Sequence, residues 1–148
     1  MSATNAFETS LLSHIFANAD IANIGDATGL RGSSTAGNLY ISLHTADPGE
    51  AAASGQQTSE CSYTSYARVA VVRSGSGWTI SGNNASNAAV VTFPTATGGS
   101  ETATHFGIGT ASSGAGVLLP KGALNATLAI SNGIAPSFAI GELDINLD

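Results

Sequence analysis

The chain has 148 residues, and only 9% of them are Asp, Glu, Lys or Arg, against about 25% in an average soluble domain. Its four basic residues are scattered along the sequence, and its formal net charge is −6. Because phosphate binding needs clustered cations, this composition argues against nucleic acid as a partner.

The sequence also argues against a membrane partner and a secretory route. No apolar run approaches the ~20 residues that cross a bilayer. Residues 1–16 have neither a basic start nor a continuous apolar stretch, so they do not resemble a signal peptide, and we expect a protein made in a cytoplasm. A chain of this length folds without disulfides. Its lone cysteine, Cys61, is expected to be buried and inert.

The first segment predicts an amphipathic helix that ends between residues 18 and 25. Thr4 or Asn5 can cap its start, and Glu8 lies in the first turn, where the helix dipole favours an anion. Its apolar stripe consists of Phe7, Leu11, Leu12, Ile15 and Phe16. Two placements stay open: the helix packs on the sheet of its own domain, or it docks on a neighbouring subunit.

After a Gly/Ser/Thr-rich loop over residues 29–38, the pattern changes to that of strands. Apolar and polar side chains alternate over residues 39–44, as in a half-buried strand. The turn Asp47-Pro48-Gly49 closes this strand, and the polar stretch 50–62 predicts an exposed loop. Further strands, separated by Gly- and Asn-rich turns, are predicted at 66–73, 78–81, 88–93, 102–109, 117–124, 128–130, 137–140 and 143–147. A tight turn is predicted at Asn132-Gly133, and Pro120 places its strand at an edge or a bulge.

This spacing of strands, with no helices between them, predicts a mainly β fold. An antiparallel sandwich or barrel accounts for the pattern, with the amphipathic helix before it. We expect residues 1–28 to form the helix and its exit loop, and residues 29–148 to form a single β-sandwich domain.

The sequence offers little catalytic or metal-binding chemistry. His14, His44 and His105 stand apart, and no G-x-S-x-G nucleophile motif accompanies them, so we expect no catalytic residues and no enzyme. A spacing of three residues separates His44, Asp47 and Glu50. We do not expect their loop to hold the fixed ligand geometry that a metal ion needs. We therefore expect no metal and no cofactor.

Three aromatic residues are the best candidates for a binding role. Tyr63, Tyr66 and Trp78 would make protein or carbohydrate contacts if they lay at an edge. For Trp78, which follows a turn and begins an alternating strand, packing in the core is the favoured interpretation.

The sequence resembles a group of small virion proteins of tailed bacteriophages, described as head-decoration (cement) or tail-fibre proteins. The resemblance runs from residue 39 to about residue 138, and its most specific pieces are "SLHTADPGE" (42–50), "THFGIGTASSG" (104–114) and "ISNGIAPSF" (130–138). It implies a virion protein with an antiparallel β-sandwich of jelly-roll type, and it brings no catalytic residues.

Two functions follow from the resemblance. The first is a capsid decoration protein that binds the major capsid protein, as a trimer, and stabilises the assembled shell by mass action. The alternative is a tail-fibre or other tail component that contacts the host surface. The loop 50–62 and six side chains are our candidates for contact with the capsid or with a second subunit. These side chains are Phe7, Leu11, Ile15, Phe16, Tyr63 and Tyr66.

Overall fold

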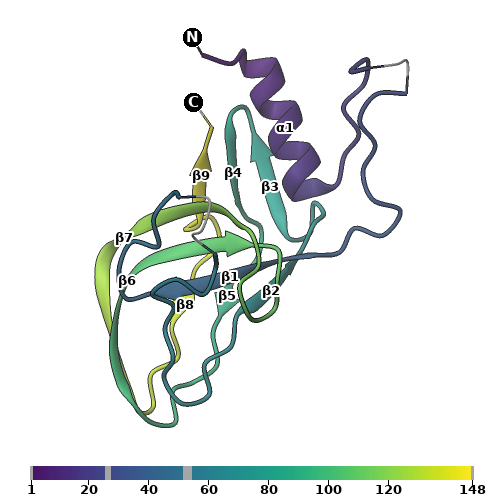
Figure 1. The fold of residues 1–148 in the computed structure, drawn as a ribbon. Coiled ribbons are helices and arrows are strands. Elements are labelled where there is room, and N and C mark those ends of the chain that lie inside the picture. Colours follow the sequence, from purple (N-terminus) through teal and green to yellow (C-terminus); the bar gives the residue numbers. More distant parts are fainter. Residues whose placement is uncertain (1, 26–27, 52–54, 148) are drawn as a thin grey trace. The chain divides into compact units, whose positions relative to one another are not determined.

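The computed structural model describes residues 2–25, 28–51 and 55–147 (Figure 1). One helix, α1 (Asn5–Ala17), precedes nine strands. The strands are β1 (Asn38–His44), β2 (Val69–Val72), β3 (Trp78–Ser81), β4 (Asn84–Asn87), β5 (Val91–Thr92), β6 (Ser100–Gly109), β7 (Leu118–Ser131), β8 (Ser137–Phe138) and β9 (Asp144–Asn146). They form sheets in the orders β2-β1-β6-β7, β3-β4-β9 and β5-β8. The predicted mainly β fold with antiparallel sheets and an N-terminal helix is confirmed, whereas the jelly-roll connectivity stays a prediction.

The chain divides into two compact units, and the expected domain boundary at residue 28 stays a prediction. Unit 1 contains residues 1–38, 72–91 and 138–148, and unit 2 contains residues 39–71 and 92–137. The helix therefore shares its unit with β3, β4 and β9.

In unit 1 the helix begins and ends where its capping residues predict. Thr4 has extended backbone angles, and its hydroxyl accepts from the amide of Phe7, which satisfies one of the free amides of the first turn. Asn18 ends the helix in the left-handed region. Arg73 then donates to the carbonyls of His14 and Ile15 at 2.7 and 2.6 Å. A cation at this end stabilises the helix, because the last carbonyls carry partial negative charge.

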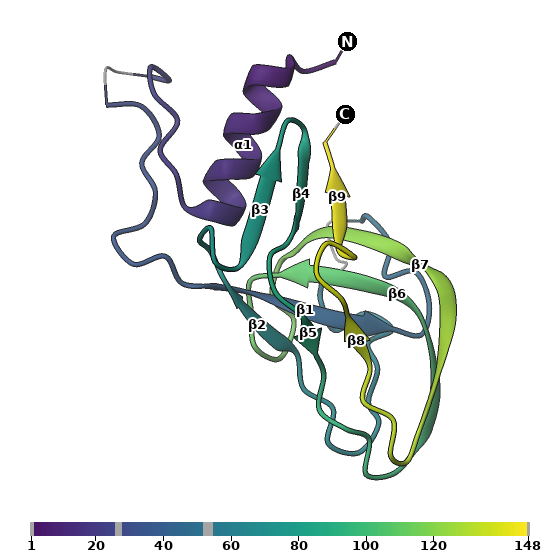
Figure 2. The same ribbon diagram turned by 180° about the vertical axis from the view of Figure 1, so that it is seen from behind.

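One side of α1 packs against β3 and β4 of the sheet β3-β4-β9, as both ribbon views show (Figures 1 and 2). Leu12 and Phe16 are buried, and the Phe16 ring meets that of Trp78 edge to face, with centroids 4.7 Å apart. Ala85 and Ile145 are register partners on the same side of the sheet and are buried too. The prediction that Trp78 lies in the core is confirmed.

Two predicted strand boundaries in this part of the chain are wrong. Residues 84–87 form β4, although the sequence predicted no strand between 78–81 and 88–93, and within the latter only Val91–Thr92 (β5) is a strand. The segment Asn-Ala-Ser-Asn has low intrinsic strand propensity. Pairing with β3 on one side and β9 on the other makes it a strand, since it supplies hydrogen bonds to both.

The four-stranded sheet β2-β1-β6-β7 dominates unit 2. β6 and β7 pair antiparallel from Ser100↔Ser131 to Gly109↔Leu118. The two strands predicted at 117–124 and 128–130 form a single strand, β7. The pairing with β6 continues past an irregularity in which four residues, 124–127, stand opposite Thr104 alone. β7 is an edge strand, which confirms the prediction from Pro120.

Candidate functional site

The two faces of the sheet in unit 2 differ in chemistry. Leu39, Ile41 and Leu43 of β1 are buried on the apolar face, where Ile41 pairs with Ile108. Tyr40, Ser42 and His44 alternate onto the opposite face, which we call the polar face. Their register partners in β6 are Gly109, Gly107 and His105.

Two glycines make room for side chains on the polar face. A Cβ at Gly109 would overlap Cδ of Gln56, and a Cβ at Gly107 would lie 2.7 Å from Nε2 of His44. The absence of side chains at these positions therefore leaves the space in which the segment 55–60 is seated. This segment was predicted to be part of an exposed loop. That prediction is wrong for Gln56, which is buried, while the expected burial of Cys61 is confirmed. Residues 52–54 of the predicted loop lie outside the described residues.

Gln56 is fully buried, and its amide joins three parts of the chain. Its Nε2 donates to the Tyr40 carbonyl at 2.8 Å. Its Oε1 accepts from Nη1 of Arg68 at 3.2 Å and from the amide of Ala111 at 3.1 Å. The main chain adds a further bond, from the Gln56 amide to the carbonyl of Ala115 at 2.7 Å. Gln56 thus holds its own segment and the loop 110–117 against β1.

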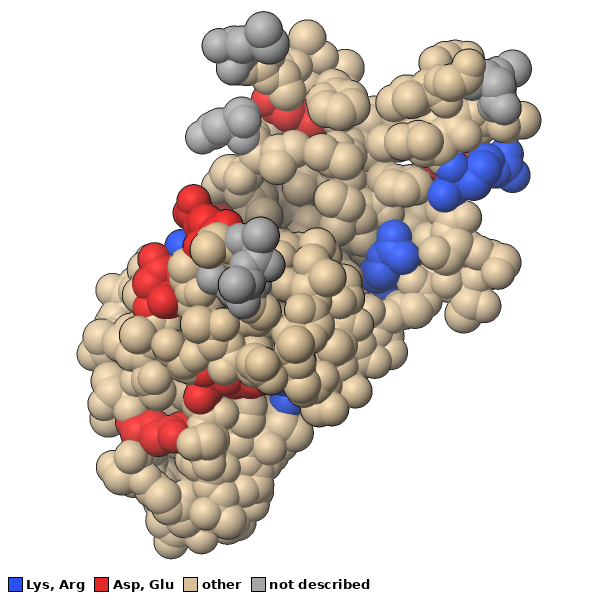
Figure 3. Space-filling view, in the orientation of Figure 1, with Lys and Arg blue, Asp and Glu red and all other residues tan. Residues whose placement is uncertain are grey.

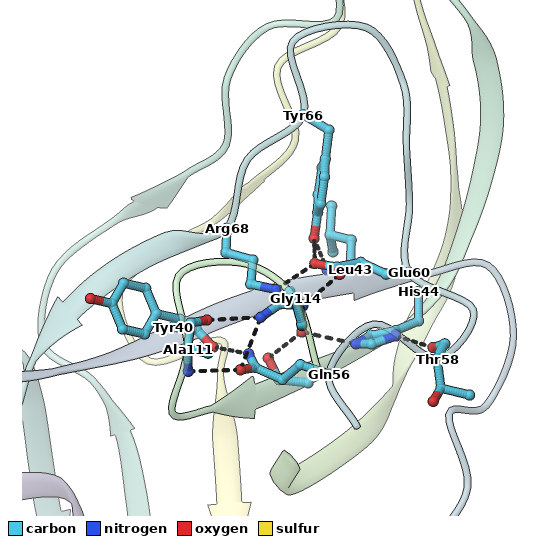
Figure 4. Close-up of polar contacts among 12 residues, drawn as sticks. Tyr40, Leu43, His44, Gln56, Thr58, Glu60, Tyr66, Arg68, Ala111 and Gly114 are labelled. Carbon is cyan, nitrogen blue, oxygen red and sulfur yellow. Dashed lines mark hydrogen bonds and ion pairs between the residues drawn. The ribbon is translucent and has the colours of Figure 1, made fainter. Parts of the chain in front are cut away.

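Arg68 is the centre of this arrangement (Figure 4). Nε and Nη2 donate to the two carboxylate oxygens of Glu60 at 2.6 and 2.7 Å, a two-pronged pairing. Nη1 also donates to the carbonyl of Ala111 at 2.8 Å, and Nη2 to that of Gly114 at 2.7 Å. With the Gln56 contact, all five guanidinium N–H groups have a partner. The hydrogen bonds to Glu60 raise the pKa of Arg68, so it stays charged.

Two tyrosines extend the network. The Tyr66 hydroxyl donates to Glu60 at 2.8 Å and accepts from the amide of Leu43 at 3.1 Å. The Tyr63 hydroxyl donates to the carbonyl of Pro94 at 2.9 Å. Burial raises the pKa of Tyr63 to about 12 and raises that of Tyr66 as well, so both remain neutral donors. We call Gln56, Glu60, Tyr66 and Arg68 the Arg68 cluster.

His44 ties the end of β1 to the segment 55–60. Its Nδ1 donates to the carbonyl of Thr58 at 2.8 Å, and its Nε2 lies 2.9 Å from the Ser42 hydroxyl. With the proton on Nδ1, Nε2 can accept from the Ser42 hydroxyl, which has the carbonyl of Gly107 at 3.2 Å as an alternative acceptor. Main-chain bonds from Thr45 to Ser59 and from Cys61 to Leu43 flank this contact. Burial lowers the pKa of His44.

The Ser42–His44 contact has the spacing of a nucleophile and its base in a hydrolase. Both residues, however, are fully buried, and the third partner is the carbonyl of Thr58 rather than a carboxylate. His44 and the Arg68 cluster together form a clamp that holds the segment 55–60 and the loop 110–117. Over residues 2–25, 28–51 and 55–147 no group of three His, Cys, Asp or Glu residues is placed to hold a metal ion.

The sequence-predicted contact residues fall into three classes of exposure. On α1, Phe7 is 46% exposed, Leu11 and Ile15 are half-buried, and Phe16 is buried against Trp78. In unit 2, Tyr63 is buried, and Tyr66 is half-buried. The two tyrosine rings meet edge to face with centroids 5.3 Å apart. The helix stripe belongs to unit 1 and the tyrosines belong to unit 2. Their contact with a partner stays a prediction.

Sequence reasoning missed Gln56, Glu60 and Arg68. The signal that could have indicated them is the scarcity of charge, since only 9% of residues are charged. In such a chain, a charged residue next to an apolar strand is a candidate for a structural ion pair. Figure 3 shows how few charged side chains lie on one face of the molecule.

A comparison with protein families places the chain. The family described as "Podophage GP4 fiber I protein gp80" matches residues 2–146. The chain belongs to this family. It is a phage structural protein, in agreement with the resemblance seen in the sequence. No curated protein matches the chain. In the part of the chain that the structure describes, no helix has the length and apolar character to span a bilayer.

Proposed function

We propose that this chain is a fibre component of the phage particle, located at the tail. The observation that carries the proposal is the match of a fibre family across residues 2–146. The charge-poor composition supports it, because a surface with few charges can be covered by a neighbouring chain at little cost in desolvation. The clamp-held loops of unit 2 supply rigid exposed backbone, which suits recognition.

Attachment to the particle is assigned to α1. The helix buries Leu12 and Phe16 against its own sheet, yet leaves Phe7 46% exposed. Phe7, Leu11 and Ile15 follow one another at intervals of four and share a side of the helix. This row is the part of the predicted stripe that is free to contact a second subunit or another virion protein.

A capsid decoration role is the competing proposal, with the major capsid protein as partner and a trimer as the binding form. The lack of internal repeats in these 148 residues favours it. Both roles are structural, and we propose that the chain is not an enzyme. The histidine contacts support this: His14 bonds to the Ala19 carbonyl, His44 is enclosed, and His105 bonds to the Thr104 hydroxyl.

Gold-labelled antibody against the purified protein, imaged on intact particles by electron microscopy, distinguishes the two roles. Label confined to the tail is expected for the fibre role. Label spread over the head in many copies would contradict it and support decoration. An active-site probe is not needed for either result.

The attachment surface is tested by incorporation of variants into particles. Phe7→Ser is expected to lower incorporation, measured by immunoblot of purified particles from a complemented infection. Ile140→Ser is the matched control, since Ile140 is 66% exposed in the same unit but lies outside the helix. Equal incorporation of both variants would remove α1 from the attachment surface. Circular dichroism of each variant verifies folding.

A further inference from the structure

Glu8 is a nearly buried carboxylate on α1 without a counter-charge. The residue is 5% exposed, and charged side chains with so little exposure are ordinarily paired or hydrogen-bonded. Over residues 2–25, 28–51 and 55–147, however, no hydrogen bond and no ion pair involves the Glu8 carboxylate. The first turn of the helix supplies partial positive charge, which amounts to about half a unit charge and leaves the anion incompletely balanced.

The carboxylate is nevertheless open to a partner. Among the described residues, the one fully enclosed side-chain nitrogen or oxygen without a hydrogen-bond partner is Nε1 of Trp78. Since the Glu8 oxygens also lack a hydrogen bond, they are not enclosed and reach the surface. The next residue, Thr9, donates to the carbonyl of Gly82 at 2.7 Å, which fixes this turn of the helix beside the turn between β3 and β4. Glu8 thus offers a fixed anion that a partner does not have to order first.

Glu8 borders the apolar row assigned above to attachment, which consists of Phe7, Leu11 and Ile15. With 3.6 residues per turn, Glu8 lies between this row and Leu12 on the buried side of the helix. It is also the one Asp, Glu, Lys or Arg in α1. A partner that covers the row meets Glu8 and removes the remaining water from its carboxylate. Because an unpaired buried charge is costly, that partner needs a cation at this position.

The Lys and Arg side chains of this chain are engaged elsewhere. The sequence holds four of them, and all lie in the described ranges. Arg68, Arg73 and Lys121 are held by carboxylates or by carbonyls of the chain. Arg31 pairs with Asp20, and its side chain is 68% exposed, so it is the one of the four that a second copy could present. The cation that complements Glu8 therefore has to come from outside this molecule.

We propose that Glu8 is the charged anchor of α1 and binds a Lys or Arg of a different virion protein, whose surface places apolar side chains beside that cation. The proposal rests on the attachment role assigned to the helix and names the chemistry of the partner. The net charge of −6 favours the approach of a basic surface. Once the partner covers the row, the carboxylate and the cation form an enclosed, charge-assisted hydrogen bond.

Cosedimentation of the purified full chain with particles produced without it tests the anchor. Glu8→Gln keeps the size of the side chain and leaves the cation of the partner unpaired, so the Kd is expected to rise at least about thirtyfold. Raising NaCl from about 0.05 to about 0.5 M should weaken wild-type binding and affect Glu8→Gln less, because salt screens the pair. Glu142→Gln is the matched control, since Glu142 is exposed in the same unit and its amide oxygen can still accept from Ala139.

Thermal unfolding gives a second readout that separates binding from folding. Glu8→Leu continues the buried side of the helix and removes an unpaired charge, so its thermal midpoint is expected not to fall. Its binding should nevertheless weaken as much as that of Glu8→Gln. A lower midpoint together with unchanged binding would make Glu8 a structural residue and overturn the proposal.

Two further variants distinguish the ways in which the proposal can fail. Unchanged binding of Glu8→Gln beside weakened binding of Phe7→Ser would overturn the anchor and leave α1 as the attachment surface, whereas unchanged binding of both would overturn both. Equal loss in Arg31→Gln, with a wild-type dimer in sedimentation velocity that both charge variants dissociate, would show that a second copy supplies the cation and overturn the proposal. Where the wild type does not add to finished particles, incorporation during the complemented infection is compared instead.

Discussion

Replacing Arg68 by Met should be among the most destabilising single changes in unit 2. The Arg68 side chain is 2% exposed and that of Glu60 14% exposed. Removing the guanidinium leaves the nearly buried Glu60 carboxylate with a hydrogen bond from the Tyr66 hydroxyl and without its cation. Breaking a buried ion pair from one side costs about 3–5 kcal/mol. Since Glu60 keeps some access to water, we expect about 3 kcal/mol.

The double replacement Arg68→Met and Glu60→Met sharpens this prediction. It removes both charges together, so the double variant should be more stable than the sum of the two single effects implies, by about 1–3 kcal/mol. Urea unfolding followed by far-UV circular dichroism measures each free energy. With a slope of about 1–3 kcal/mol per molar urea, the single Arg68 variant should unfold at least about 1 M earlier.

Arg31→Met is the matched control for this experiment. Arg31 pairs with Asp20 at 3.4 Å, but its side chain is 68% exposed, and pairs in this setting contribute little. We expect its unfolding curve to match that of the wild type. If Arg68→Met cost no more than Arg31→Met, the Arg68 cluster would not hold the loops, and the reasoning would fail.

Three further predictions follow from the packing. Gly109→Ala should lower the thermal midpoint, at a cost of about 1–3 kcal/mol, because its methyl group overlaps Gln56; Gly75→Ala, where nothing lies within 4 Å, should not. Arg73→Met should cost about 1–2 kcal/mol and increase amide exchange in the last turn of α1, because the carbonyls there lose a charged donor; unchanged exchange would contradict this. Burial raises the pKa of Cys61 to about 12, so iodoacetamide at pH 8 should alkylate the folded protein over about a hundredfold more slowly than the urea-unfolded chain, and equal rates would refute its burial.

Local signals in the sequence were sufficient for the elements whose structure depends on neighbouring residues. Thr4 caps α1 and Asn18 ends it because both act within one turn of the chain. The alternation over residues 39–44 predicted β1, because successive side chains of a strand point to opposite faces of the sheet and apolar residues mark one of these faces. Pro120 marked an edge strand for the same local reason.

The elements that were missed depend on partners distant in the sequence. β4 has no strand-like composition and exists because β3 and β9 pair with it. Arg68 finds its acceptors in the loop 110–117, 43 and 46 positions further on. No pattern within a window of the sequence shows that contact. The division of the helix stripe into a buried and an exposed row likewise required the position of the sheet.

The composition of unit 1 from three separate stretches has a consequence for synthesis. α1 is made early, but Arg73, which holds its last turn, comes 59 positions after His14. At about 5–20 residues per second, the helix waits roughly 3 to 12 seconds for that contact, with Leu12 and Phe16 uncovered. β9 arrives later still, after residue 137, the last residue of unit 2. Unit 2 can therefore fold on the ribosome first, while the apolar side of α1 is available to a chaperone until the final stretch emerges.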